Sequence, residues 1–213
     1  LAMAAGVAAA GAVGLINGTI IAKGRITDSI VTLGALSAAS GLALIISDGK
    51  PITVLNRAML KLASSGIGPL NWSVIIAAVV AVAAHFALFN SRFGLHVLAT
   101  GGSEESARAV GVRTARVKIA VYTLSGVLAG VGAILLVARV GAAEPASNTS
   151  FLLNSVAAVV LGGVSLFGGR ATIIGPVMGA LLLTALVNGL TLLGLSQFYQ
   201  PLAVGIVVVL AAL

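Results

Sequence analysis

The sequence predicts an all-α fold, a polytopic transmembrane helical bundle. The first observation is composition: hydrophobic residues make up 59% of the chain and charged residues only 8%, against about 25% charged residues in soluble domains. The second is that apolar runs long enough to cross about 30 Å of hydrocarbon recur along the whole length. The third is that the alternating segments of about ten residues typical of a membrane β-barrel are missing from the sequence.

Six apolar stretches are each predicted to form one membrane-spanning helix. In chain order they are residues 1–22, 29–47, 71–89, 117–138, 171–193 and 198–213. A seventh stretch, Asn154–Phe167, is too short to span as an untilted helix and runs into the glycine-rich sequence LGGVSLFGGR. Such a segment is typical of a broken or re-entrant helix, whose irregular backbone is tolerated only inside protein or beside water. We expect it in the interior of the bundle.

Residues 49–70 fit none of these patterns. We expect a short surface helix there, with four apolar side chains against the membrane interface: Val54, Leu55, Met59 and Leu62.

Pairs of glycines four residues apart occur in three predicted spans. They are Gly14 and Gly18, Gly126 and Gly130, and Gly175 and Gly179. Small residues at this spacing let two membrane helices approach closely. Each pair therefore predicts a close helix crossing, with chance occurrence in a glycine-rich chain as the alternative. The similar sequences LING at 15–18 and LVNG at 186–189 hint at an inverted repeat.

The longest polar interruption, Arg92–Lys118, holds five of the twelve basic residues and two of the five acidic residues. Its centre predicts a short cytoplasmic helix: Ser103 can cap the N-terminus, Glu104 and Glu105 complement the helix dipole, and Gly111 is a stop signal. The positive-inside rule favours a cytoplasmic location for this loop. We expect a partner to dock on the capped helix; the alternative is a solvated connector whose charges only set topology.

Several kinds of chemistry are absent from the sequence. There is no cysteine, two histidines cannot form a metal site by themselves, and no GxxxxGK[ST] loop is present to hold a nucleotide. The five acids lie near span ends or in loops, which weakens an ion-coupled mechanism. The net charge of +7 fits basic cytoplasmic loops better than nucleic-acid binding.

Neutral polar side chains remain within the spans. The best candidates for a translocation path are Asn17, Asn154, Ser155 and Asn188, because uncharged donors and acceptors can pass a polar solute without burying a charge. The alternative is that they form hydrogen bonds between helices.

Three stretches resemble the permease subunits of bacterial ABC importers of the ribose, xylose and autoinducer type, whose superfamily includes the branched-chain amino acid permeases. They are Gly14–Leu44, Phe93–Pro145 and Ala157–Gln200, which cover most of the chain in the family's order. The resemblance implies a single permease domain over residues 1–213, a fragment that lacks the family's N-terminal spans, in the bacterial plasma (inner) membrane. One departure is that Thr27 and Asp28 stand where the family commonly has proline.

The resemblance also implies that the polar helix is the coupling helix seated on an ATP-binding cassette subunit. The matching positions are Gly101, Gly102, Glu104, Ala107, Arg108 and Gly111. It implies two further partners, an extracytoplasmic solute-binding protein and a second permease copy, identical or not. ATP would be bound by the partner subunit, with no cofactor on this chain.

The main hypothesis is therefore an ATP-driven importer subunit, without its own ATPase site, that translocates a monosaccharide or similar small polar solute. The pattern AVVLGG followed by LFGGR, between residues 158 and 170, favours a sugar within the family. Three alternatives stay open: an ABC permease for branched-chain amino acids or nucleosides, an ATP-independent channel or secondary carrier, and a purely structural membrane subunit.

Overall fold

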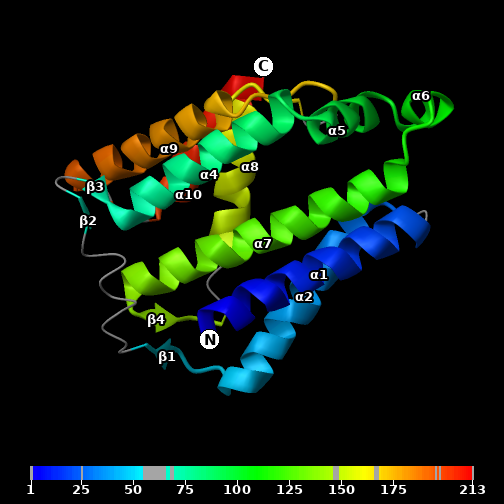
Figure 1. Cartoon of the computed structure of the whole chain (residues 1–213). Coiled ribbons are helices and arrows are strands. Elements are labelled where there is room, and N and C mark those ends of the chain that lie inside the picture. Colours follow the sequence, from blue (N-terminus) through cyan, green and yellow to red (C-terminus); the bar gives the residue numbers. More distant parts are fainter. Residues whose placement is uncertain are drawn as a thin grey trace. The chain divides into compact units, whose positions relative to one another are not determined.

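A computed structural model describes most of the chain. The described residues are 2–24, 26–54, 66–67, 70–145, 149–165, 168–194, 196 and 198–212. The helices are α1 (Ala2–Gly24), α2 (Asp28–Ser47), α4 (Trp72–Phe89), α5 (Arg92–Gly102), α6 (Glu104–Ala109), α7 (Thr114–Val140), α8 (Thr149–Leu161), α9 (Ile174–Leu192) and α10 (Tyr199–Ala212) (Figure 1). The strands are β1 (Ile52–Thr53), β2 (Gly66–Ile67), β3 (Leu70–Asn71) and β4 (Ala142–Ala143).

The all-α class is confirmed, and the protein is a multi-pass membrane protein. Five helices in the described part of the chain are long and apolar enough to cross a membrane, namely α1, α2, α4, α7 and α9. Each coincides with one of the predicted spans. The sixth prediction corresponds to α10, which has 14 residues and belongs with α8 among the shorter apolar helices.

The chain packs into two compact units. The first contains Leu1–Val80 and Ala107–Ser147, and the second contains Ala81–Ser106 and Asn148–Leu213. Each unit is built around one helix pair, α1 with α7 in the first and α8 with α9 in the second.

In the first unit α1 and α7 run antiparallel and in close contact along most of their length (Figure 1). A Cβ added at Gly18 would lie 2.9 Å from the Cα of Ile119, and one at Gly14 would overlap the carbonyl oxygen of Tyr122. From the other helix, a Cβ at Gly130 would lie 3.0 Å from the Cα of Val7. The crossing predicted from these glycine pairs is confirmed, because only glycine lets the two backbones approach this closely.

Helix α2 is attached to this pair at both ends. At its start, the Tyr122 hydroxyl on α7 donates a hydrogen bond of 2.9 Å to the carboxylate of Asp28. Beyond its end, β1 pairs antiparallel with β4, with Ile52 opposite Ala143. The helix begins at Asp28 with Thr27 as its N-cap residue, whose side chain makes no capping bond. The chain therefore starts this helix without proline.

In the second unit α8 and α9 form an antiparallel hairpin. A Cβ at Gly179 would overlap the carbonyl oxygen of Ala158, and one at Gly175 would overlap that of Gly162, so the third predicted glycine pair also marks a close crossing. An apolar cluster completes the core and includes α10, through Ala157, Ala158, Leu183 and Val204. The short apolar stretch predicted at Asn154–Phe167 corresponds to α8, whose helix ends before Gly162 and Gly163. Ala157 and Ala158, near its C-terminal end, are its buried residues.

The polar stretch after α4 contains a helix that the sequence analysis missed. Helix α5 occupies residues 92–102, where only a connection to the central helix was expected. Its N-cap is Ser91, whose hydroxyl accepts a hydrogen bond of 3.1 Å from the Gly94 amide. A Cβ at Gly94 would overlap the carbonyl oxygen of Leu88, so glycine permits the sharp turn between α4 and α5.

The surface helix expected within residues 49–70 falls largely on positions 55–65, which include Leu55, Met59 and Leu62 and lie outside the described residues. Val54 is described, and its amide donates to the carbonyl oxygen of Gly141 at 2.9 Å. The flanking positions form β1 and the short antiparallel β2–β3 ladder instead of helix.

Candidate coupling segment and translocation path

The N-terminus of helix α6 is capped by Ser103, as the sequence predicts. The Ser103 hydroxyl accepts a hydrogen bond of 3.2 Å from the Ser106 amide, which is the N-cap interaction. Glu104 and Glu105 occupy the first turn, where carboxylates interact favourably with the helix dipole. Such caps matter because six residues are too few to form a stable helix alone.

The C-terminus of α6 ends in a Schellman motif. The amide of Val112 donates to the carbonyl oxygen of Ala107 at 3.0 Å, and the amide of Gly111 donates to that of Arg108 at 2.9 Å. Gly111 has a φ of +85°, which only glycine adopts without strain. The Arg108 Nε donates to the Thr114 hydroxyl at 2.9 Å, which connects α6 to the first residue of α7.

The predicted coupling residues occupy different surroundings. Ala107 is buried, with 3% of its surface exposed. Arg108 and Gly111 are exposed, and Glu104 is half-buried. Gly101 and Gly102 are not part of the turn before α6, because they form the last residues of α5.

One candidate contact residue was missed. Val110, directly after α6, is 79% exposed, although it stands in a strongly polar stretch. A single exposed apolar side chain is common on protein surfaces, so Val110 is a candidate because it directly follows the predicted docking helix α6. In the sequence, Val110 is an apolar residue next to Gly111 in a stretch whose pattern is dominated by charged residues.

The translocation-path candidates lie on three helices. Asn17 is half-buried on α1 beside Gly18, in the first unit, while Asn154 on α8 and Asn188 on α9 are exposed in the second. Within the described part of the chain, the amides of Asn154 and Asn188 make no hydrogen bond. An amide without a partner in hydrocarbon costs several kcal/mol. These two side chains therefore need water, a solute or another protein surface.

The hydroxyl groups in the spans behave differently from the amides. Ser155 donates to the carbonyl oxygen of Phe151 at 2.7 Å, and Thr184 donates to that of Ala180 at 2.8 Å. Both bonds stay within one helix, four residues back. They are not the interhelical bonds considered as the alternative, and they leave less donor capacity for a solute.

The hairpin register brings Asn154 and Asn188 to the same half of the second unit. Because Gly162 lies against Gly175 and Ala158 against Gly179, Asn154 is level with residues near Leu183. Asn188 lies about five residues beyond that level, which is about 7.5 Å along the helix axis. Both amides are therefore in the half of the hairpin away from its loop.

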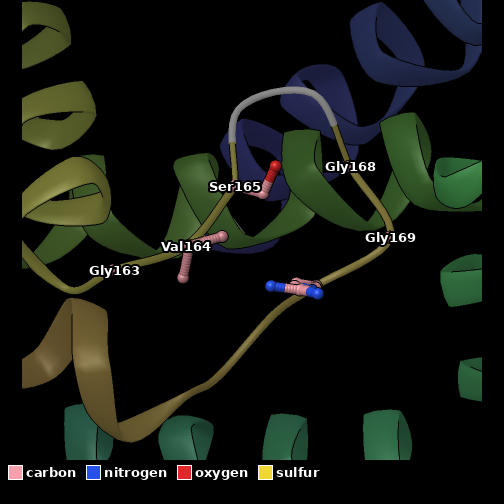
Figure 2. A pocket seen from close by; sticks show the side chains of 6 residues that line it. Gly163, Val164, Ser165, Gly168 and Gly169 are labelled. Carbon is pink, nitrogen blue, oxygen red and sulfur yellow. The ribbon is translucent and has the colours of Figure 1, made fainter. Parts of the chain in front are cut away.

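At the other end, the α8–α9 loop encloses an open recess of about 590 Å³. Three of its six lining residues are glycines; the lining residues are Gly163, Val164, Ser165, Gly168, Gly169 and Arg170. Figure 2 shows the first three of these on one arm of the loop and Gly168 and Gly169 on the other. In the ranges that the structure describes, no group of three or more His, Cys, Asp or Glu side chains is placed to hold a metal ion.

Comparison with known proteins identifies the family. Residues 1–212 match the family described as the permease component of the branched-chain amino acid transport system. The chain belongs to this family. It is 39% identical to the ribose import permease protein RbsC of Escherichia coli, over 100% of this chain and 68% of that protein.

Other relatives in the family are of similar identity. The Bacillus subtilis ribose import permease protein RbsC is 37% identical over 92% of this chain and 62% of its own length. The L-arabinose ABC transporter permease protein AraH of Azospirillum brasilense is 38% identical over 100% of this chain and 63% of its own length. The chain thus spans about two thirds of the relatives it matches. No solved structure gives a significant match.

Proposed function

We propose that this protein is the membrane-spanning subunit of an ATP-driven importer in the bacterial inner membrane, and that its solute is a monosaccharide. Membership of the permease family carries the proposal. The sugar is favoured over a branched-chain amino acid because the similar proteins named above are a ribose import permease and an L-arabinose transporter permease. Residues 1–213 would act as one permease domain.

The ATP-binding partner would dock on α6. The capped N-terminus, the Schellman motif and the Arg108–Thr114 bond support this part, because together they give a six-residue helix a defined shape and connect it to α7. The proposed coupling set is Gly101, Gly102, Glu104, Ala107, Arg108 and Gly111, with exposed Val110 added. Ala107 is buried and would hold the helix in place, while the more exposed members would make the contact. ATP would be hydrolysed by that partner, and a binding protein would deliver the sugar to a pair of permease copies.

The solute would pass along neutral amides. The exposure of Asn154 and Asn188 without a hydrogen-bond partner in the described chain supports a polar path, since hydroxyl-rich sugars offer donors and acceptors to both groups. Asn17 and Ser155 complete the proposed set. A second permease copy covering these amides is the competing explanation, which changes of substrate preference would exclude.

The proposal is tested by reconstituting the chain with a candidate ATP-binding cassette subunit and a candidate sugar-binding protein. We expect uptake of radiolabelled D-ribose or L-arabinose into proteoliposomes only with ATP and both partners. A double variant, Glu104→Ala with Arg108→Ala, should lose ATPase co-purification and uptake. Flux without any ATPase subunit would instead identify a channel or carrier, and unchanged assembly in the double variant would exclude the docking assignment.

A further inference from the structure

A contact between glycines joins the end of α5 to the α8–α9 loop within the second unit. A Cβ added at Gly168 would overlap the carbonyl oxygen of Gly101, and a Cβ at Gly169 would lie 3.0 Å from the Cα of Gly102. From the other side, a Cβ at Gly101 would lie 3.2 Å from the backbone nitrogen of Gly169. Two backbones therefore touch here with no side chain between them.

The loop has a defined shape at this contact. Gly168 and Gly169 have φ values of +90° and +78°, in the region that favours glycine. The Gly168 amide donates to the carbonyl oxygen of Ser165 at 3.2 Å, and the Ser165 amide donates to that of Arg170 at 3.3 Å. These bonds connect the two arms seen in Figure 2 and hold Gly168 and Gly169 beside the end of α5.

Both sides of the contact lead directly to the proposed functional elements. Gly102 immediately precedes Ser103, the N-cap of α6. On the loop side, the Thr172 hydroxyl accepts a hydrogen bond of 3.2 Å from the Gly175 amide at the start of α9. Gly175 is also the first glycine of the close crossing between α9 and the end of α8. The contact is therefore a short route between the docking helix and the hairpin that carries the exposed amides.

We propose that Gly168 and Gly169 are positioning residues of the transport cycle, which transmit the displacement of α5 and α6 to the α8–α9 hairpin. The inference rests on the proposed function. A side chain in the contact could change rotamer and absorb a small displacement, whereas backbone packed on backbone has no such freedom. The end of α5 and the loop therefore move together through the cycle.

The first test is Gly168→Ala in the complete reconstituted transporter, with D-ribose taken up per ATP hydrolysed as the readout. We expect the ATPase to co-purify and the ratio to fall about tenfold, because the added methyl group forces the backbones at Gly101 and Gly168 apart and loosens the contact. The matched control is Gly163→Ala, because Gly163 lies in the same loop with a φ of +69° but its Cβ would meet nothing within 4 Å. The control should stay within about twofold of wild type.

Equal ratios in the two variants would overturn the inference. So would loss of ATPase binding in Gly168→Ala, because the residue would then be needed for assembly and not for transmission. If the wild-type complex itself showed no ATP-dependent ribose uptake, the proposed function would fail instead. The two failures are therefore distinguishable.

A second test measures the contact itself and does not depend on the sugar. The chain has no cysteine, so Gly102→Cys with Gly169→Cys introduces its only two thiols. A Cβ at Gly102 would lie 3.6 Å from the Gly169 Cα, within reach of a disulfide. The rate of disulfide formation should be equal, within about twofold, in nucleotide-free and ATP-trapped complexes if the segments move together. A tenfold lower rate in either state would overturn the inference.

Discussion

In the α1–α7 pair, both helices contribute glycines to the crossing. In the α8–α9 pair, the glycines at the crossing are Gly175 and Gly179 on α9 and Gly162, which follows α8. In the first pair, Gly14 and Gly18 on α1 pack against the backbone of α7 near Tyr122 and Ile119, and Gly126 and Gly130 on α7 pack against the backbone of α1 near Ala10 and Val7. In the second, close approach is confined to the loop end, and apolar residues fill the rest. The first arrangement fixes two long helices against each other. The second fixes one end of a short hairpin and leaves exposed amides at the other.

The difference suggests a division of labour between the pairs. Backbone contact along a 27-residue helix leaves no single place where the first pair can open. The second pair includes a 13-residue helix and a glycine loop that touches α5. The helices of the first pair are therefore expected to resist separation more strongly than those of the second pair.

The largest expected loss of stability comes from a substitution in the contact between α1 and α7. Gly14→Ala places a methyl group on the Tyr122 carbonyl oxygen and should destabilise the protein by about 3 kcal/mol, the upper end of the overpacking range. Unfolding by SDS in mixed micelles measures it. Gly6→Ala on the same helix meets nothing within 4 Å and should be neutral or stabilising. If both variants unfold alike, α1 and α7 do not cross as described.

A smaller loss of stability is expected in the second pair. Gly179→Ala would overlap the carbonyl oxygen of Ala158, but the short α8 can shift, so we expect about 2 kcal/mol. The same SDS titration applies. Gly189→Ala on the same helix, with nothing within 4 Å, is the control. A cost equal to or larger than that of Gly14→Ala would contradict the contrast between the pairs.

For the exposed amide of Asn188 in the second pair, the expected effect is on uptake and not on stability. Asn188→Leu removes a group that would bind the solute, so uptake should fall about tenfold, the effect of one lost hydrogen bond to a polar ligand. The free energy of unfolding should stay constant or rise. Thr184→Val on the same helix loses only a bond to its own backbone and should keep its uptake. Loss of stability without any change in uptake or sugar preference would identify Asn188 as structural.

The smallest effect concerns the polar bond in the first unit. Tyr122→Phe removes the hydrogen bond to Asp28 and should cost about 0.6 kcal/mol, the average for such bonds in membranes. Asp28→Asn retains an acceptor and should cost less. A loss of several kcal/mol in the SDS titration would mean that this bond, and not glycine packing, holds the first unit together.

Much of the fold could be predicted from local sequence features, namely apolar runs and capping residues. The positions of the five long helices follow from apolar runs, and the caps of α6 follow from Ser103 and Gly111. Helix α5 was missed because its apolar and polar residues alternate around the helix and no long apolar run marks it. The cap at Ser91 was the available signal.

The site was predicted less completely than the fold. The three asparagines were selected because an amide in a span needs partners, but the sequence did not separate half-buried Asn17 from exposed Asn154 and Asn188. Val110 was missed because exposure depends on the surroundings of a side chain and not on its type. The Ser155 and Thr184 hydroxyls bond to carbonyl oxygens of their own helices. The Thr191 hydroxyl on α9 also accepts a hydrogen bond of 3.3 Å from the Gln200 side-chain amide on α10.

By itself the sequence determined the membrane location, the spans and the glycine pairs, since these depend on local composition and spacing. Only the tertiary structure decided which backbone each glycine touches, because a helix partner is chosen by contacts between residues far apart in the chain. Gly101 and Gly168 illustrate this, since neither position shows in the sequence that it meets the other. Their contact is what connects the predicted docking helix to the hairpin.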